Sequence, residues 1–404
     1  MCIQGLGSTS GRKSHGKWLA IHLCNLAGED KVTVDGKKVH RTPEEREQWT
    51  RSNTRAILSY AENPRNNTGW HKADKPWQFL AACFEWTGYQ EEGDAFRSHL
   101  AGALDGSCSG VQMLAGMTRD ASAGAMVNLV PSERGDDYYG RMAEALSKRL
   151  CGLVDHADAA TMARLQFWAE KSIDRDLLKG PSMTKVYSAG TYTFGEQVQS
   201  KTGAPDAESM WLASQINACF SDVAPGMLNA MAFLQAVSDV MTAAGFPLVW
   251  RTPAGLRVEQ ARLARKSVRL ETQISGPESR RSRTFSVDTD DLSKNDQRAG
   301  VAPNFVHGVD ASHMAFVVND LYRKGVRNFW MIHDSFGAPF AQCGEVFRST
   351  REQFIELMSP DLLRRWTDDV VAALTDEQRA ALPQIPSYGA LDLSVVRESL
   401  YAWF

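Results

Sequence analysis

Two short segments place an aspartate where a metal ion could bind. Asp105 leaves a short apolar run and enters a stretch of small residues, 106–110, which would let another backbone or a nucleotide come close. Asp334 follows His333 in a pattern that predicts a tight turn between two strands. Carboxylates suit Mg²⁺, and two such ions about 4 Å apart can stabilise both oxygens of a phosphoryl transfer. Each aspartate alone is more simply interpreted as a turn residue, and the sequence does not show whether they converge.

A second pattern places side chains four residues apart. Arg175, Lys179, Met183 and Tyr187 would form one slowly winding stripe on a helix. Cations in a row suit a triphosphate, because the leaving pyrophosphate gains charge in the transition state. The alternative is a solvated basic face that ends in a core tyrosine. Pro181 weakens a long regular helix unless it lies near the first turn.

A third segment, residues 304–313, contains two histidines and an aspartate: His307, Asp310 and His313. Such a set could bind a metal ion. The alternative is a polar junction in which Asp310 or Ser312 caps the following helix. We favour the junction, because no further ligand completes a transition-metal set.

The pattern of apolar and turn residues predicts the elements that hold these segments. Helices are expected at 17–61 with polar links and a cap at Thr42, at 75–86, at 210–244 and at 312–324. Residues 246–285 are predicted to be extended around a turn at 252–255, and this region is basic. A strand at 326–332, a tight turn and a second strand would place His333 and Asp334 at the tip of a hairpin.

Length and composition exclude some classes of protein. The chain has 404 residues, 43% of them hydrophobic and 23% charged, which is ordinary for a globular protein of two or three domains. Its net charge of -3 argues against a uniformly basic coat but allows a local basic cleft. No apolar run is long enough to span a bilayer, and no secretory signal is recognisable. The seven scattered cysteines form no CxxC pair, which predicts reduced thiols in a cytosolic protein and no zinc site.

Further short motifs occur in a fixed order along the chain. They are WLAIH at 18–22, AGEDKV at 27–32, DGSCSGVQ at 105–112, RD at 119–120, VNLVPSE at 127–133, the stripe at 175–187, APNFVH at 302–307 with SH at 312–313, and IHDSFG at 332–337. This series, which extends from about residue 17 to 404, resembles the single-subunit RNA polymerases of bacteriophages and their mitochondrial and chloroplast relatives. Any one motif would be a weak signal, but their shared order is a strong one.

The resemblance implies a role for each candidate residue. Asp105 and Asp334 would bind Mg²⁺. Arg175 and Lys179 would bind the nucleotide triphosphate, and Lys179 would also assist the departure of pyrophosphate. Two further side chains, Tyr187 and His307, would select ribose over deoxyribose. His333 would support the site near the RNA 3′ end.

The resemblance also implies a fold of the α+β class, mainly helical, arranged as the palm and fingers of a right-hand polymerase. Residues 1–121 would form the first part of the palm with a helical insertion, 122–307 the fingers, and 308–404 the second part of the palm. The basic region at 246–285 looks like a promoter-specificity loop. In that loop Arg269 and Glu271 fall near positions that read bases in the major groove.

Some features of the family are absent from this sequence. The template-binding DxxGR motif, the thumb and the N-terminal promoter domain have no counterpart in the chain. Gly180 replaces the arginine that usually follows the lysine. Ser188 replaces the glycine after the tyrosine, which makes the exit of that helix a point to examine.

These departures suggest that the chain is the larger half of a split phage polymerase. An upstream polypeptide would supply DxxGR and the thumb, and an exposed apolar surface should mark where it binds. DNA template and promoter, RNA and NTPs would be the other partners. A non-catalytic nucleic-acid-binding fragment is the alternative. A related DNA polymerase is disfavoured, because those enzymes tend to have HDE where this chain has His333-Asp334-Ser335.

Overall fold

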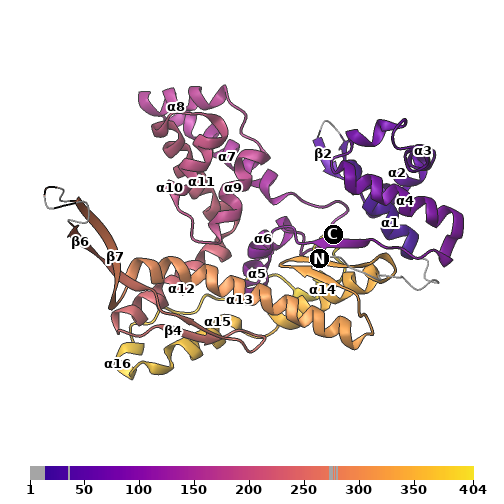
Figure 1. The fold of residues 1–404 in the computed structure, drawn as a ribbon. Coiled ribbons are helices and arrows are strands. Elements are labelled where there is room, and N and C mark those ends of the chain that lie inside the picture. Colours follow the sequence, from indigo (N-terminus) through magenta and orange to yellow (C-terminus); the bar gives the residue numbers. More distant parts are fainter. Residues whose placement is uncertain (1–13, 35–36, 273–275, 277, 279–280) are drawn as a thin grey trace.

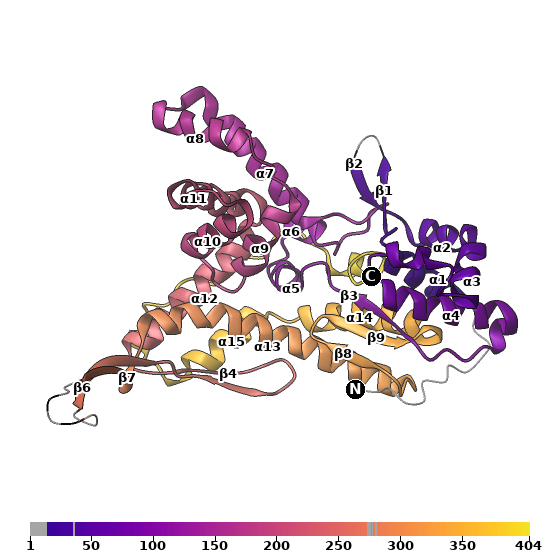
Figure 2. The same ribbon diagram turned by 45° about the horizontal axis from the view of Figure 1, so that its top comes forward.

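The computed structural model describes residues 14–404 except 35–36, 273–275, 277 and 279–280. The chain is mainly helical, with small antiparallel sheets. Two groups of helices, α1–α4 and α7–α11, stand apart on either side of a small central sheet and α5–α6 (Figures 1 and 2). The mainly helical α+β class predicted from the sequence is therefore confirmed. Within the described residues, no helix is both long enough and apolar enough to cross a membrane.

The first helical group has a core of its own. Its elements are α1 (Ser14–Ala27), β1 (Lys31–Val34), β2 (Lys37–His40), α2 (Pro43–Ser52), α3 (Thr54–Glu62) and α4 (Pro76–Glu92). Leu23, Ile57 and Trp86 are among the buried side chains that join its helices. Thr42 caps α2 in a reciprocal capping box with Glu45, as its position before Pro43 predicts. The hairpin β1–β2 was not anticipated within the predicted helical region.

The central sheet joins two distant parts of the chain. It consists of β3 (Ala101–Asp105), β9 (Ser335–Pro339) and β8 (Trp330–Ile332), paired antiparallel in the order β3-β9-β8. Ile332 pairs with Ser335, so the predicted hairpin is present and His333 and Asp334 form its two-residue turn. The first strand begins at Trp330, later than predicted. Val326 instead closes the end of the preceding helix, where its N–H donates to the Leu321 carbonyl.

The central helices continue the main hydrophobic core. They are α5 (Ser109–Thr118), α6 (Ala121–Met126), α7 (Tyr138–Leu153), α8 (Ala159–Ala169), α9 (Arg175–Lys185), α10 (Thr191–Thr202), α11 (Asp206–Val223) and α12 (Pro225–Ala243). The helical pattern predicted at 210–244 is two helices rather than one. The break falls at Ala224, because a residue before proline is disfavoured in the helical conformation.

Helix α9 ends two residues before Tyr187, so the four-residue stripe continues past the regular helix. Ser188 then adopts the left-handed conformation, with φ of +65°. The Ala189 N–H donates to the Thr184 carbonyl and closes the helix end. The departure from glycine at position 188 is therefore accommodated, but the serine occupies a conformation that favours glycine.

We expect Ser188→Gly to stabilise the protein by about 1 kcal/mol, because glycine reaches positive φ without the steric cost that a Cβ brings. The buried Ser188 hydroxyl also has no hydrogen-bond partner in the described residues. Urea unfolding would measure the change in the free energy of unfolding. Ser188→Ala is the matched control, since it removes the hydroxyl and keeps the Cβ; equal effects of the two variants would contradict the backbone explanation.

Residues 294–323 form a single long helix, α13 (Lys294–Arg323), capped by the Ser293 hydroxyl. The predicted junction near residue 310 is therefore wrong. Asp310 and Ser312 lie inside the helix and cap nothing; the Ser312 hydroxyl donates to the carbonyl of Gly308, one turn earlier. The apolar face continues upstream through Val301 and Phe305, and this buried face extends the helix to Lys294.

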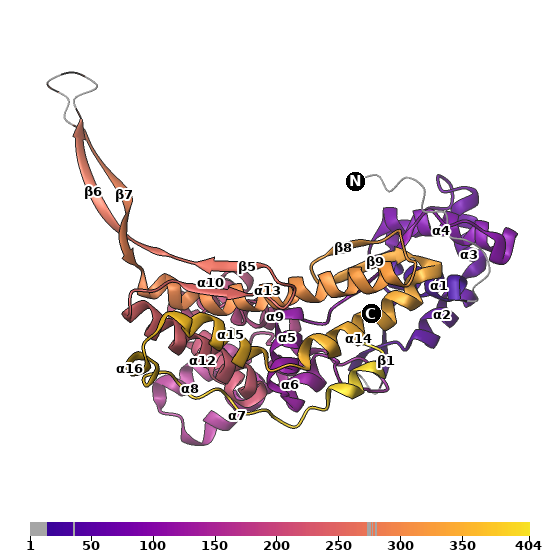
Figure 3. The same cartoon turned by 90° about the horizontal axis from the view of Figure 1, so that it is seen from below.

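The described residues of the region 246–285 are mainly extended, as predicted, and the last strand of this region continues to Leu292. Its strands are β4 (Leu248–Arg251), β5 (Arg257–Gln260), β6 (Leu263–Thr272) and β7 (Arg281–Leu292). Strands β6 and β7 form a two-stranded ribbon that projects from the body (Figure 3). Arg269 lies opposite Thr284 and Glu271 lies opposite Ser282, so these four side chains share one polar face of the ribbon. Arg280, part of the predicted basic stretch, lies outside the described residues.

The C-terminal segment returns to the central sheet. Its helices are α14 (Cys343–Met358), α15 (Leu362–Val370) and α16 (Asp376–Arg379). Trp403 is fully buried and bridges to Gly106, while the Phe404 N–H donates to the Asp105 carbonyl. The last residues of the chain therefore brace the strand end that carries Asp105.

Candidate active site

Asp105 and Asp334 lie next to each other at one end of the central sheet. Asp105 pairs with Ser335 in the β3–β9 ladder, and the Gly106 N–H donates to the Asp334 carbonyl at 3.2 Å. A Cβ at Gly106 would lie 2.8 Å from the Gln112 side-chain oxygen and 3.0 Å from an Asp334 carboxylate oxygen, so a larger residue here would crowd both side chains. Desolvation, and then the negative charge of Asp334, raise the pKa of Asp105 to about 6. Two carboxylates that repel each other in this way are suited to sharing a cation.

The seven residues that the sequence predicts to be catalytic or substrate-binding all line one cavity of about 480 Å³. They are Asp105, Arg175, Lys179, Tyr187, His307, His333 and Asp334. These residues come from the central sheet, α9 with the residues that follow it, and α13. Arg269 and Glu271 are not part of this cavity but lie on the projecting ribbon β6–β7.

Arg175 and Lys179 differ in how they are held. Arg175 is the first residue of α9, and its Nε donates to a carboxylate oxygen of Asp137 at 2.6 Å. Its guanidinium also lies 5.2 Å from the centre of the Tyr139 ring. Lys179, one turn further along, is exposed, and the described part of the chain offers it no hydrogen bond or ion pair. Arg175 is therefore fixed in place, whereas Lys179 is an uncompensated cation at the cavity wall.

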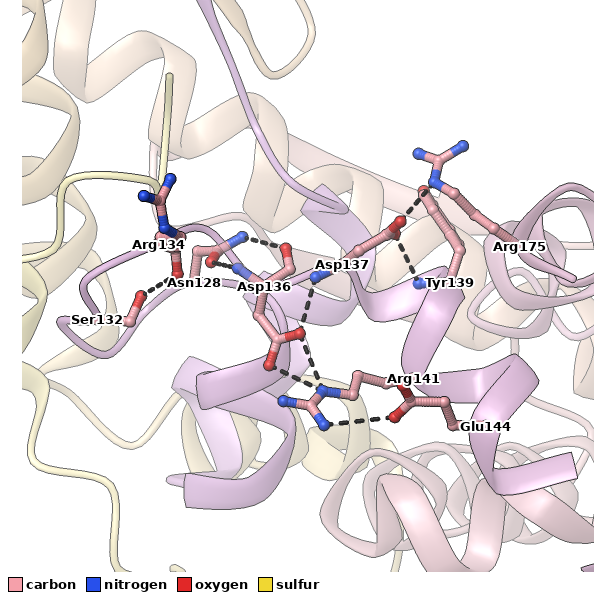
Figure 4. Close-up of polar contacts among 9 residues, drawn as sticks. All are labelled: Asn128, Ser132, Arg134, Asp136, Asp137, Tyr139, Arg141, Glu144 and Arg175. Atoms are coloured by element: carbon pink, nitrogen blue, oxygen red, sulfur yellow. Dashed lines mark hydrogen bonds and ion pairs between the residues drawn. The ribbon is translucent and has the colours of Figure 1, made fainter. Parts of the chain in front are cut away.

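The loop before α7 fixes Asp137, a residue that the sequence analysis missed. Asn128 accepts a hydrogen bond from the Asp136 N–H at 2.7 Å and donates to the Asp136 carbonyl (Figure 4). Asp137 uses one carboxylate oxygen to cap α7, through the Tyr139 N–H, and the other to bind Arg175. The Asp137 side chain thus links the first turn of α7 to the first turn of α9. A paired Asp136-Asp137 directly before two tyrosines was the only signal in the sequence.

Tyr187 and His307 form a stacked pair in the cavity. Their ring centres are 4.7 Å apart and the rings are nearly parallel, at 5°. Burial raises the pKa of Tyr187 to about 12, so its hydroxyl is protonated at neutral pH. Burial and then the charge of His333 lower the pKa of His307, which favours the neutral imidazole. The pair presents a hydroxyl and a neutral ring to the same space.

His333 and Asp310 complete the side of the cavity near the hairpin. His333 adopts a positive φ of 53°, and its ring centre lies 6.3 Å from that of His307. Asp310 is buried, and desolvation, followed by the charge of Asp334, raises its pKa to about 6. His313, which the sequence analysis grouped with His307, lies apart in the core and hydrogen-bonds the Thr350 carbonyl at 2.8 Å.

Comparisons with known proteins agree with this architecture. A family described as DNA-dependent RNA polymerase matches residues 10–381. The chain is 29% identical to T7 RNA polymerase of Escherichia phage T7 over 96% of its own length and 48% of that protein. It is 30% identical to the mitochondrial DNA-directed RNA polymerase of Mus musculus over 95% of its own length and 33% of that protein.

A chloroplastic DNA-directed RNA polymerase 3 of Nicotiana sylvestris is 29% identical over 96% of the chain and 39% of its own length. The chain therefore spans about half, or less, of the length of these relatives. The family match covers most of the chain, and phage and organellar relatives agree with it. The chain belongs to the single-subunit, bacteriophage-type family of DNA-directed RNA polymerases and corresponds to its C-terminal portion.

Proposed function

We propose that this chain catalyses DNA-directed RNA synthesis during phage transcription, in the cytoplasm of the host cell. The reaction joins the 3′ oxygen of the RNA to the α-phosphorus of an NTP and releases pyrophosphate. The observation that carries the proposal is the convergence of two carboxylates and two cations on one cavity, from segments far apart in the sequence. Phosphoryl transfer depends mainly on positioning and charge stabilisation, which such a set supplies.

Asp105 and Asp334 are the residues that would hold Mg²⁺. Their adjacency and the repulsion between them fit a hard cation with oxygen ligands. When bound, Mg²⁺ supplies stabilisation of the charge that develops on the reacting oxygens.

The other cavity residues would orient the nucleotide. Lys179 would lie against the triphosphate and stabilise the departing pyrophosphate, and Arg175 would bind the same phosphates from a fixed position. The Tyr187 hydroxyl and the neutral His307 ring would recognise the ribose 2′-hydroxyl. His333, at the hairpin tip, would support the RNA 3′ end.

The proposed division of the chain follows these roles. Residues 1–121 and 308–404 would form the palm, with α1–α4 as a helical insertion. Residues 122–307 would form the fingers, with the ribbon β6–β7 as the specificity loop. Its polar face, which carries Arg269 and Glu271, would enter the major groove of the promoter.

The proposal includes a separate upstream polypeptide that carries DxxGR and the thumb. The surface that favours such a partner is the outer face of α4, where Trp77 is 76% exposed and Phe84 is 49% exposed. These residues are two turns apart, so both lie on the same face of α4.

The test is extension of an RNA primer on a short DNA template with NTPs and Mg²⁺, by the chain alone and with an added upstream polypeptide that contains DxxGR. We expect little or no extension by the chain alone and clear extension by the mixture. Vigorous extension by the chain alone would refute the need for a partner but support catalysis. No extension in either case would favour the alternative, a nucleic-acid-binding fragment whose DNA affinity depends on salt.

Asp137→Asn should raise the KM for NTPs about three- to tenfold with a smaller effect on kcat. Asparagine still caps α7 but removes the charge that holds Arg175. Steady-state kinetics of primer extension would measure both constants. Asp176→Asn is the control, because Asp176 contacts Arg175 only at 3.6 Å from an exposed position. An unchanged KM in the Asp137 variant would argue against a positioning role.

Arg269→Ala should lower promoter-dependent initiation about tenfold or more and leave primer extension on a preformed template unchanged. One arginine contact to a base provides about 1–3 kcal/mol of discrimination. Initiation would be measured on promoter and scrambled DNA. Arg283→Ala removes the same charge from the opposite ribbon face, where Arg283 pairs with Leu270, and should affect both DNAs equally. Equal behaviour of the two variants would exclude base reading by Arg269.

A further inference from the structure

Three potential metal ligands meet beside the carboxylate pair. One ligand atom each from His307, Asp310 and His333 lies within 4.8 Å of the other two. His307 and Asp310 are three residues apart on α13, so they point from the same face of one helix. His333 reaches them from the β8–β9 turn, where its backbone has a positive φ of 53°. Two separate elements therefore supply a set that the sequence segment 304–313 does not contain.

Asp310 is a buried carboxylate that lacks an ion-pair partner among the described arginines and lysines. Its side chain is only 5% exposed, and its Oδ1 has no hydrogen-bond partner among the described residues. None of the described arginines or lysines forms an ion pair with it. A buried carboxylate without a partner is costly, and a cation held between it and the two imidazoles would offset that cost.

The ligand types select the kind of ion. Two imidazole nitrogens and one carboxylate suit Zn²⁺ and neighbouring transition metals, whereas Mg²⁺ prefers an oxygen set and retains its water. In a tetrahedral Zn²⁺ site with bonds of about 2.0–2.1 Å, the ligand atoms lie about 3.4 Å apart. The ligand atoms here need to move inward by about 1 Å or less to reach that geometry, which side-chain rotation provides.

We propose that His307, Asp310 and His333 form a transition-metal site of the Zn²⁺ class, separate from the carboxylate pair Asp105 and Asp334. A bound ion fastens the β8–β9 turn to α13. It also occupies the space beside Tyr187, whose ring stacks on His307. If the proposed function is correct, Zn²⁺ at this site therefore slows nucleotide addition by blocking the ribose side of the cavity.

The test uses the full chain with excess Mg²⁺ and measures Zn²⁺ binding by titration calorimetry. Asp310→Asn and His333→Gln should each weaken binding at least about tenfold, since loss even of an outer-shell partner costs that much. Asp105→Asn should leave the affinity for Zn²⁺ close to that of the wild type. Circular dichroism checks that the variants are folded, and the exposed position of His333 makes its variant the safer of the two.

Cobalt supplies a second readout that needs no activity. Co²⁺ bound by two histidines and a carboxylate should give visible d–d bands without the strong charge-transfer band of a thiolate ligand, and those bands should disappear in His333→Gln. Absence of saturable Zn²⁺ binding to the wild type would overturn the proposal. Binding that survives Asp310→Asn but is lost in Asp105→Asn would overturn it as well, because the ion would then occupy the carboxylate pair. These outcomes leave the polymerase proposal unaffected.

Discussion

Asp105→Ala and Asp334→Ala should each lower the rate of primer extension about a thousandfold or more. Metal-ion stabilisation of the reacting oxygens contributes several kcal/mol, and each 1.36 kcal/mol corresponds to a factor of ten. Asp105 is the last residue of β3 and Asp334 lies beside it in the β8–β9 turn, with the Gly106 N–H donating to the Asp334 carbonyl. Neither can replace the other, so the double variant should be hardly slower than either single one.

The matched control is Asp376→Ala, an exposed aspartate in the first turn of α16 and outside the cavity. It should extend RNA at the wild-type rate. DNA affinity at fixed salt should be nearly unchanged in all three variants, because phosphate contacts by basic residues provide most of it. Wild-type extension rates in either cavity variant would contradict the assignment of the carboxylates.

Lys179→Met should reduce kcat about a hundredfold to a thousandfold, with a smaller change in KM. Loss of one preorganised group that stabilises charge in the transition state typically costs that much. Lys179 has no partner in the described residues that would already neutralise it, so its full charge is available to a departing pyrophosphate. The positive charge of Arg175 is already partly neutralised by its ion pair with Asp137. Arg175→Met should therefore affect KM more than kcat.

Rapid-quench kinetics of single-nucleotide addition would separate these effects. Lys179→Arg keeps the charge and should retain more activity than Lys179→Met, whereas Lys201→Met, in the last turn of α10, should behave as the wild type. A large rise in KM for Lys179→Met with kcat unchanged would show that the lysine binds the ground state and transition state equally.

Local signals in the sequence were sufficient to predict several elements. The cap at Thr42, the turn residues His333 and Asp334 and the extended basic region each depend on neighbouring residues. The prediction of a junction within 304–313 was wrong because these polar residues lie on one continuous helix, where they face different surroundings. Tertiary packing of the apolar face of α13 outweighed the local preference of aspartate and serine for caps.

The candidate site was only partly accessible to sequence reasoning. The motifs indicated candidate residues for the site, but the pairing of β3 with β9 joins residues more than 200 positions apart, and no local pattern encodes it. The Asp137–Arg175 contact and the approach of His333 to Asp310 also depend on tertiary structure. Charged or metal-binding partners from separate elements become visible only when the fold is known.

The most direct test of the account is template-dictated addition of one nucleotide. A labelled RNA primer would be paired with four DNA templates that differ only in the templating base, and the chain would be supplied with the upstream polypeptide, Mg²⁺ and each NTP in turn. The account predicts addition of the complementary ribonucleotide on each template and none with Asp334→Ala. Addition that ignores the templating base, or that persists in the Asp334 variant, would contradict it.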